Sequence, residues 1–157
     1  MNYEAVELEI TGRLKASNDL SAIADITQLP EDIDKYKIPV VNGLVTVVFM
    51  GETFDKNQSI GQISQHSTAT FNISIQSRRL RGVKGVYSIS ELIKQSLIGF
   101  IPTDCGMISL GDFDYVNYQN DVWEYSLAVA CRSLRTQIHP HFVDAPVTDD
   151  QVYYQPK

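Results

Sequence analysis

The sequence predicts an α+β fold, in which two helices pack on one face of a mainly antiparallel sheet. Three observations favour this fold class. Apolar residues recur at helical spacing in two segments, and each of these is followed by two segments of strand character. The connections inside each pair of strands suit antiparallel pairing. The predicted order is therefore helix, two strands, helix, two strands.

The first helix is predicted over residues 2–16. Tyr3, Val6, Ile10 and Leu14 recur at steps of three and four residues and form one apolar stripe. Glutamates lie in the first turns and cations near the end, as the helix dipole favours. The segment 17–39 has no clear period and contains two prolines, so we predict a loop with a short helical turn or a short strand.

The next two segments have the composition of strands. Residues 40–50 are rich in β-branched side chains and apolar on both faces, which predicts a covered strand. Residues 67–77 alternate, with Ala69, Phe71, Ile73 and Ile75 on one face and polar side chains on the other. That polar face meets either water or another subunit. The polar stretch 51–66 is predicted to be a long, projecting connection.

A cluster of four cations leads into the second helix. Arg78, Arg79, Arg81 and Lys84 form the densest positive charge in a chain whose net charge is −6. Three interpretations remain open: a solvated basic turn, a charged contact with another protein, or a site for nucleic acid or phosphate. The last would use the free N–H groups of the following helix N-terminus.

The second helix carries the clearest end signals in the chain. Ser88 and Glu91 fit a capping box at its start, in which each side chain binds a backbone N–H of the other's residue. Gly99 can adopt the left-handed conformation at its end, and Pro102 prevents continuation. The apolar face is formed by Ile89, Leu92, Ile93, Leu97 and Phe100.

Two further strands are predicted over residues 106–118, with a bend near Gly111, and over residues 122–132. The sequence YQND between them suits a hairpin turn. Residues 139–157 contain three prolines and the tyrosines Tyr153 and Tyr154, which favours an extended C-terminal arm. We therefore expect one domain over residues 1–138, followed by an arm over residues 139–157.

The composition excludes several classes of protein. Apolar content of 43% and charged content of 20% are ordinary for a globular domain. The apolar runs are too short to cross a bilayer, and the first residues lack a basic leader, so we expect no membrane partner. Two cysteines are too few for a disulfide framework and favour a reducing compartment. The acidic balance argues against nucleic acid as the main partner.

Motifs for nucleotide or metal chemistry are missing or incomplete. Gly82 and Gly85 have neither the phosphate-loop spacing nor the dinucleotide fingerprint. His139 and His141 stand two residues apart with Asp144 nearby, and in a strand they would share a face. They lack a third strong ligand, and a proline separates them. We therefore predict no cofactor and no metal site.

No catalytic set is predicted either. Cys105 has nothing beyond its residue type to support a role as a nucleophile, and Cys131 lies on an apolar strand face. Asp112 and Asp114 have no recognisable partner, and the chain has no GxSxG motif. Tyrosine is favoured at protein interfaces, so Tyr153 and Tyr154 join the four cations as candidate interaction residues.

Several phrases of the sequence resemble one protein family. They are YEAVELEITGRLKA near the start, ATFNISIQSRRL, GVYSISELIKQSLIGFIP and VWEYSLAVACRS, which together span most of residues 3–133. In this order they resemble the tail terminator proteins of long-tailed bacteriophages, particularly those of Mu-like phages with contractile tails. The strongest phrase is the second helix with its closing Leu-x-Gly-Phe-x-Pro. The segment 18–66 and the arm carry little of the resemblance.

The resemblance implies an α+β domain that assembles as a homo-hexameric ring on the head-proximal end of the tail tube. Such a ring stops tube polymerisation and offers a docking surface to the neck or head connector. It contacts the tail tube protein, the sheath protein where the tail is contractile, and phage DNA that passes through the lumen without specific recognition. The expected location is the tail or neck of the virion, and the host cytoplasm during assembly.

Two other functions remain open at this point. One is a head-side neck adaptor or another tail-completion protein of similar size. The other is a small enzyme or ligand-binding domain that uses Cys105, His139 and His141.

Overall fold

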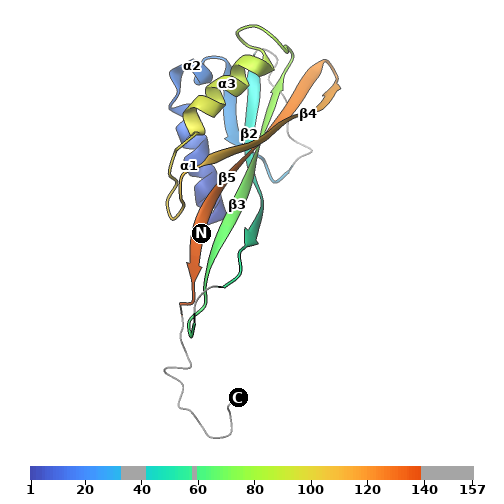
Figure 1. The fold of residues 1–157 in the computed structure, drawn as a ribbon. Helices are drawn as coiled ribbons and strands as arrows, with labels where there is room; N and C mark the ends of the chain where they lie inside the picture. The colour runs from blue at the N-terminus through green and yellow to red at the C-terminus, as the bar shows by residue number, and fades with distance from the viewer. Residues whose placement is uncertain (33–41, 58–59, 139–157) are drawn as a thin grey trace, which may run out of the picture.

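The computed structural model describes residues 1–32, 42–57 and 60–138. Five strands form one sheet in the order β1-β2-β3-β5-β4, with antiparallel pairing except between β1 and β2. Figure 1 shows the helices together on one face of this sheet, which confirms the predicted α+β class. The elements are α1 (Tyr3–Lys15), α2 (Asn18–Ser21), β1 (Ala24–Gln28), β2 (Gly43–Phe54), β3 (Ser64–Ser77), α3 (Val86–Leu97), β4 (Ser109–Gln119) and β5 (Val122–Thr136).

The segment after α1 contains both of the short elements that its sequence allowed. Ser17 caps α2 by accepting a hydrogen bond from the Leu20 N–H at 3.3 Å. The chain then enters β1, which pairs with β2 in parallel from Ala24 opposite Gly43. No helix among the described residues is long and apolar enough to span a membrane.

The central strand is β3, which pairs along its whole length with β5, from Ser64 opposite Thr136 to Ser77 opposite Trp123. Its predicted alternation is confirmed, because Phe71, Ile73 and Ile75 are buried while the polar residues between them are half-buried. Both long helices pack their apolar faces on this side of the sheet. The contributing residues are Val6, Ile10 and Leu14 from α1 and Ile89, Ile93 and Leu97 from α3.

The strands are longer than predicted at the end that lies beyond the helices. β2 continues to Phe54 and β3 begins at Ser64, so the predicted connection 51–66 shrinks to residues 55–63. β5 likewise continues to Thr136 instead of stopping at residue 132. Polar side chains are tolerated in these extensions because backbone pairing and side-chain contacts between β2 and β5 hold them in the sheet without a hydrophobic core. Residues 40 and 41 of the first predicted strand lie outside the described residues.

A bulge in β2 is stabilised from α1. The register with β3 shifts between Phe49 and Gly51, which interrupts the ladder at that point. The Phe49 N–H donates to the Glu7 carboxylate at 2.7 Å, and Glu7 also accepts from the Gln28 amide at 3.0 Å. One acidic side chain of α1 thus joins β1 to β2.

The predicted start of α3 is wrong. The helix begins at Val86 with Gly85 as its N-cap, and the Ser88 hydroxyl donates to the Gly82 carbonyl at 2.7 Å instead of capping the helix. Glu91 pairs with Lys94 rather than reaching back to the cap. Backbone carbonyls of the preceding turn, those of Arg79 and Leu80, instead satisfy the first two helical N–H groups. The predicted end is confirmed, since Gly99 has φ of +81°.

The last two strands form the predicted hairpin. Asn120 and Asp121 both have positive φ, at 54° and 62°, which matches a two-residue type I′ turn. β4 begins at Ser109, three residues later than predicted. Its register with β5 shifts at two places, the first of them around Gly111, where a bend was expected.

Replacing Leu97 with alanine should lower the free energy of unfolding by about 2–5 kcal/mol, because the side chain is fully buried between α3 and the sheet. The matched control is Ile98→Ala at the neighbouring position, where the side chain is 62% exposed and the expected loss is below about 0.5 kcal/mol. Urea denaturation of both variants measures the difference. Equal losses would mean that α3 does not bury its Leu97 face.

Candidate interaction surfaces

The four predicted cations lie in the turn between β3 and α3, which we call the basic turn (residues 78–85). Arg78, Arg79 and Arg81 are exposed, and Lys84 is half-buried. None of the ion pairs within the described parts of the chain includes these four residues. The charges of these side chains are therefore not neutralised by ion pairs with other described residues.

Hydrogen bonds hold the basic turn in one conformation. The N–H groups of Val86 and Tyr87 donate to the carbonyls of Arg79 and Leu80 at 3.0 and 3.2 Å. A side chain at Gly85 would place its Cβ 2.6 Å from the Arg81 backbone, so only glycine fits there. Because the Val86 and Tyr87 N–H groups already have partners, the N-terminus of α3 offers a phosphate fewer donors than an uncapped helix does.

A row of aromatic rings runs from α3 along the β4–β5 hairpin, and we call it the aromatic ladder. It consists of Tyr87, Phe113, Tyr115, Tyr118, Trp123 and Tyr125. Ring centroids are 5.2 Å apart between Phe113 and Tyr125, and 4.4 Å apart between Tyr118 and Trp123. These spacings lie at or near the range in which aromatic pairs attract.

The second bulge of β4 keeps the ladder on one face. Tyr115 lies opposite Tyr125, and Tyr118 lies opposite Trp123, although the two tyrosines are three positions apart in the sequence. The register shift between Tyr115 and Asn117 makes this possible, since directly opposed residues share a face. At the tip, the Tyr118 hydroxyl donates to the Asp121 carboxylate at 3.2 Å. Without this register shift, the alternation of side chains along β4 would place Tyr118 on the face opposite to Tyr115.

The basic turn and the aromatic ladder meet at Tyr87. The Arg81 guanidinium lies over the Tyr87 ring at 5.9 Å, and this ring contacts Tyr125 edge-on. We call the combined area the basic–aromatic surface. Three of its rings are open to solvent, with Tyr115 55%, Tyr118 48% and Tyr87 41% exposed, while the other three are half-buried against the core. Tyr87 also borders an apolar groove between α2 and α3, lined by Ile23, Val83 and Leu92.

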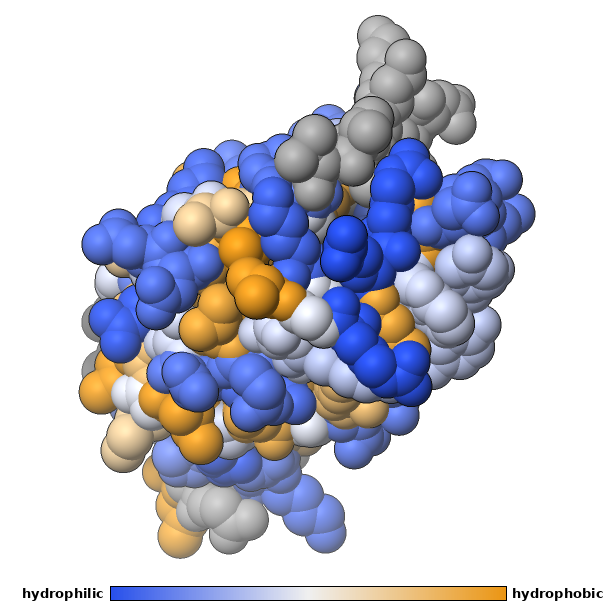
Figure 2. All heavy atoms as spheres, turned by 90° about the horizontal axis from the view of Figure 1, so that it is seen from above, coloured by the Kyte–Doolittle hydropathy of each residue, from blue (hydrophilic) through white to orange (hydrophobic). Residues whose placement is uncertain are grey.

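Figure 2 views the molecule from above and shows apolar side chains interspersed with strongly hydrophilic ones at this end. Val83 is 74% exposed and contributes apolar area beside the arginines. Exposed aromatic and arginine side chains together are typical of the centres of protein interfaces.

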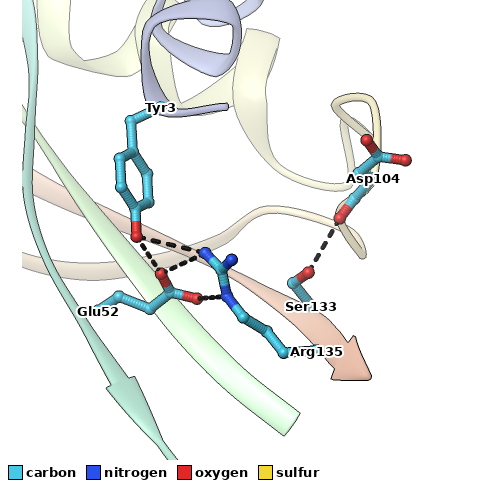
Figure 3. A network of polar contacts seen from close by, with 5 residues as sticks. All are labelled: Tyr3, Glu52, Asp104, Ser133 and Arg135. Atoms are coloured by element: carbon cyan, nitrogen blue, oxygen red, sulfur yellow. Dashed lines mark hydrogen bonds and ion pairs between the residues drawn. The ribbon is translucent and has the colours of Figure 1, made fainter. Parts of the chain in front are cut away.

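At the other end of the sheet, a buried carboxylate joins three elements (Figure 3). Glu52 of β2 is paired with Arg135 of β5, with its oxygens 2.8 Å from Nη2 and 3.1 Å from Nε. The Tyr3 hydroxyl donates to the same carboxylate and accepts from Arg135 Nη2 at 3.2 Å. The Glu52 side chain is only 3% exposed, so its carboxylate is almost completely shielded from solvent.

The Glu52 pKa shows which effect dominates. Burial by itself raises the pKa of a carboxyl, but the hydrogen bonds from Arg135 and Tyr3 outweigh it and lower the pKa of Glu52 from 4.5 to about 2. The Arg135 pKa is raised by the same contact. The pair therefore stays ionised at any physiological pH and ties β2, β5 and the start of α1 together.

Beyond this network β2, β3 and β5 extend past the ends of the helices, as Figure 1 shows at the lower end of the molecule. Several apolar side chains there are exposed, which makes the distal end of β2, β3 and β5 a second candidate surface. They are Phe54, Ile60, Ile63, Leu134 and Ile138. The Arg135 guanidinium also lies over the Phe54 ring at 5.7 Å, so the network orients one of them.

The two cysteines do not offer a nucleophile. Burial raises the pKa of the Cys105 thiol, and it raises the pKa of Cys131 to about 12. Both thiols therefore remain protonated at neutral pH. Asp112 and Asp114 are exposed on β4, and no side-chain hydrogen bond or ion pair joins either carboxylate to another described residue.

The remaining predicted residues cannot be placed. His139, His141, Tyr153 and Tyr154 lie outside the described residues, as does the predicted arm 139–157. Within the described ranges, no cluster of three or more histidine, cysteine or acidic side chains could hold a metal ion.

Sequence reasoning missed the network and the extent of the ladder for different reasons. Tyr3, Glu52 and Arg135 are far apart in the sequence and form no local pattern. The ladder did leave a signal, because aromatic residues cluster on both sides of the predicted YQND turn, at positions 113, 115 and 118 and at 123 and 125.

Comparisons with known proteins support the fold and add a family. A family model described as "Gp37 protein" matches residues 10–150. A solved chain from the "Virion of native gene transfer agent (GTA) particle" has a similar fold, with a TM-score of 0.58 and 12% sequence identity. The match covers 84% of this chain and 96% of that chain. No curated protein matches the sequence.

Replacing Glu52 with glutamine should destabilise the protein by roughly 3 kcal/mol at pH 7, since the charge on Arg135 then loses its buried partner. The lowered pKa means that this stabilisation is present above about pH 4.5 and is lost as the pH falls towards 2. The difference between variant and wild type should therefore shrink on acidification. Denaturant titrations at pH 7 and at pH 2.5 (about the lowered pKa) measure it.

The same substitution in an exposed pair serves as the control. Glu91 is 64% exposed and pairs with Lys94 at 3.1 Å, so Glu91→Gln should cost less than about 0.5 kcal/mol at either pH. A Glu52→Gln loss as small as that of the control would show that the network does not stabilise the fold.

Proposed function

This chain belongs to the Gp37 protein family, and we propose that it acts as a structural protein of a phage-like particle rather than as an enzyme. The observation that carries the proposal is the fold shared with the gene transfer agent virion chain. Because 96% of that chain is covered, the whole domain corresponds rather than a single motif. The exposed aromatic, basic and apolar surfaces support a role in assembly, since they suit contacts with other proteins.

Within such a particle, we propose the more specific role of tail terminator. Copies of the chain form a homo-hexameric ring on the head-proximal end of the tail tube, stop its polymerisation and offer a docking surface to the neck or head connector. The partners are the tail tube protein, the sheath protein in a contractile tail, and DNA that crosses the lumen without sequence recognition. The protein resides in the tail or neck of the virion, and in the host cytoplasm during assembly.

Three features support this role. The sequence phrases over residues 3–133 resemble those of tail terminators. The domain also has two separate exposed surfaces at opposite ends, as a protein with neighbours on several sides requires. The region 1–138 supplies both surfaces. The third feature is the arm that the sequence predicts over residues 139–157, which lie outside the described residues.

The test is to remove the gene from a particle that encodes this chain and to measure tail tubes by negative-stain microscopy. A terminator predicts tubes of uncontrolled length without attached heads, and normal tails when the chain is restored. In vitro, the purified chain added to polymerising tube protein should stop growth and leave a ring at one end of each tube.

A head-side adaptor gives the opposite pattern. Tails of normal length would assemble in its absence, and the chain would co-purify with the portal. Either result would contradict the terminator role while leaving a structural role intact. Normal infectious particles without the gene would contradict both.

A further inference from the structure

The two free edges of the sheet differ in chemistry. In the described part of the chain, β1 and β4 each have one neighbouring strand, so each leaves a row of backbone N–H and C=O groups unpaired. β4 is exposed over most of its length, and it carries two rings of the aromatic ladder that are about half open to solvent. Monomeric proteins rarely leave a long edge with exposed aromatic residues uncovered.

The edge at β1 carries exposed acidic residues. Asp25 is exposed near the start of β1, and Glu31 is exposed shortly after its end. The basic turn holds four of the cations of a chain with net charge −6, so the rest of the chain carries −6 − 4 = −10. Outside its basic turn, a second copy therefore carries a net negative charge.

The geometry selects a head-to-tail contact. A two-fold symmetric contact through the basic–aromatic surface would place the arginines of both copies against each other. In a head-to-tail contact the basic–aromatic surface of one copy meets the β1 edge of the next, and opposite charges face each other. Because β1 and β4 lie at opposite edges of the sheet, such contacts can repeat and close into a ring.

Nucleic acid fits this surface less well. The chain as a whole is acidic, which disfavours phosphate binding, and the Val86 and Tyr87 N–H groups at the start of α3 already donate to the carbonyls of Arg79 and Leu80.

We propose that the basic–aromatic surface binds the acidic β1 edge of a second copy of this chain. The proposal rests on the ring-forming function proposed above and assigns the two faces of its subunit contact. Arg79 and Arg81 supply the charge that orients the neighbour, while Tyr115 and Tyr118 supply buried area.

A charge-swap experiment tests the pairing. One variant reverses the basic side (Arg79→Glu with Arg81→Glu), a second reverses the acidic side (Asp25→Lys with Glu31→Lys), and a third combines all four changes. Self-association is measured by sedimentation equilibrium, and for a chain that is monomeric alone, by the fraction of tail-tube ends that carry a ring. Lys56→Glu, an exposed cation in the β2–β3 connection, is the control. Thermal unfolding followed by circular dichroism shows whether each variant is folded.

Each two-residue reversal should weaken association at least about tenfold, because it places like charges together. The combined variant should recover most of the wild-type association, and Lys56→Glu should change little. Recovery separates a direct contact from a general effect of charge or folding.

Other outcomes overturn the assignment. If folded variants still form rings after either reversal, or if the combined variant does not recover, the two faces do not meet, although the ring function stands. Loss of binding to a DNA duplex in the arginine variant, with self-association unchanged, would assign the surface to nucleic acid. A wild-type chain that forms no ring, alone or on tubes, would remove the proposed function together with this contact.

Discussion

The helices cover only part of the length of the sheet, and this mismatch places the exposed apolar side chains at the distal end of β2, β3 and β5. The 14 residues of β3 extend for about 46 Å, whereas the 13 residues of α1 rise by only about 20 Å. Apolar residues fill the stretch where the two layers overlap. Outside it the strands have no helix to pack against, and their side chains must meet solvent or another protein.

The distal end of the sheet and the β4–β5 hairpin are stabilised by different interactions. At the distal end a dry carboxylate is held by a guanidinium and a phenol, which fixes the relative positions of β2, β5 and α1. At the β4–β5 hairpin, aromatic rings pack against one another, with Lys94 lying over Phe113 at 4.4 Å. The first arrangement specifies geometry because removing Arg135 would leave the buried Glu52 charge without its partner. The second leaves apolar area exposed and available for binding.

Local sequence patterns predicted the buried parts of the helices and strands, but they did not predict the start of α3 or the ends of the long strands. The alternation through Phe71, Ile73 and Ile75 and the helical stripe through Ile89 and Leu97 were both visible in the sequence, because burial imposes a period on each. The start of α3 was missed because the backbone carbonyls of Arg79 and Leu80 replace a side-chain cap, which no residue pattern records. The strand extensions and the Glu52–Arg135 pair depend on partners dozens of residues away.

The unbroken register between β3 and β5 has a mechanical consequence. β2 and β4 each contain bulges, whereas β3 and β5 are paired without a shift from one end of the sheet to the other. A load applied between the distal end and the end near the basic turn would run along these two strands. Since the hydrogen bonds of an antiparallel pair lie perpendicular to the strands, such a load shears all of them at once instead of opening them in turn. The central pair therefore forms a stiff rod, with two more adaptable strands beside it.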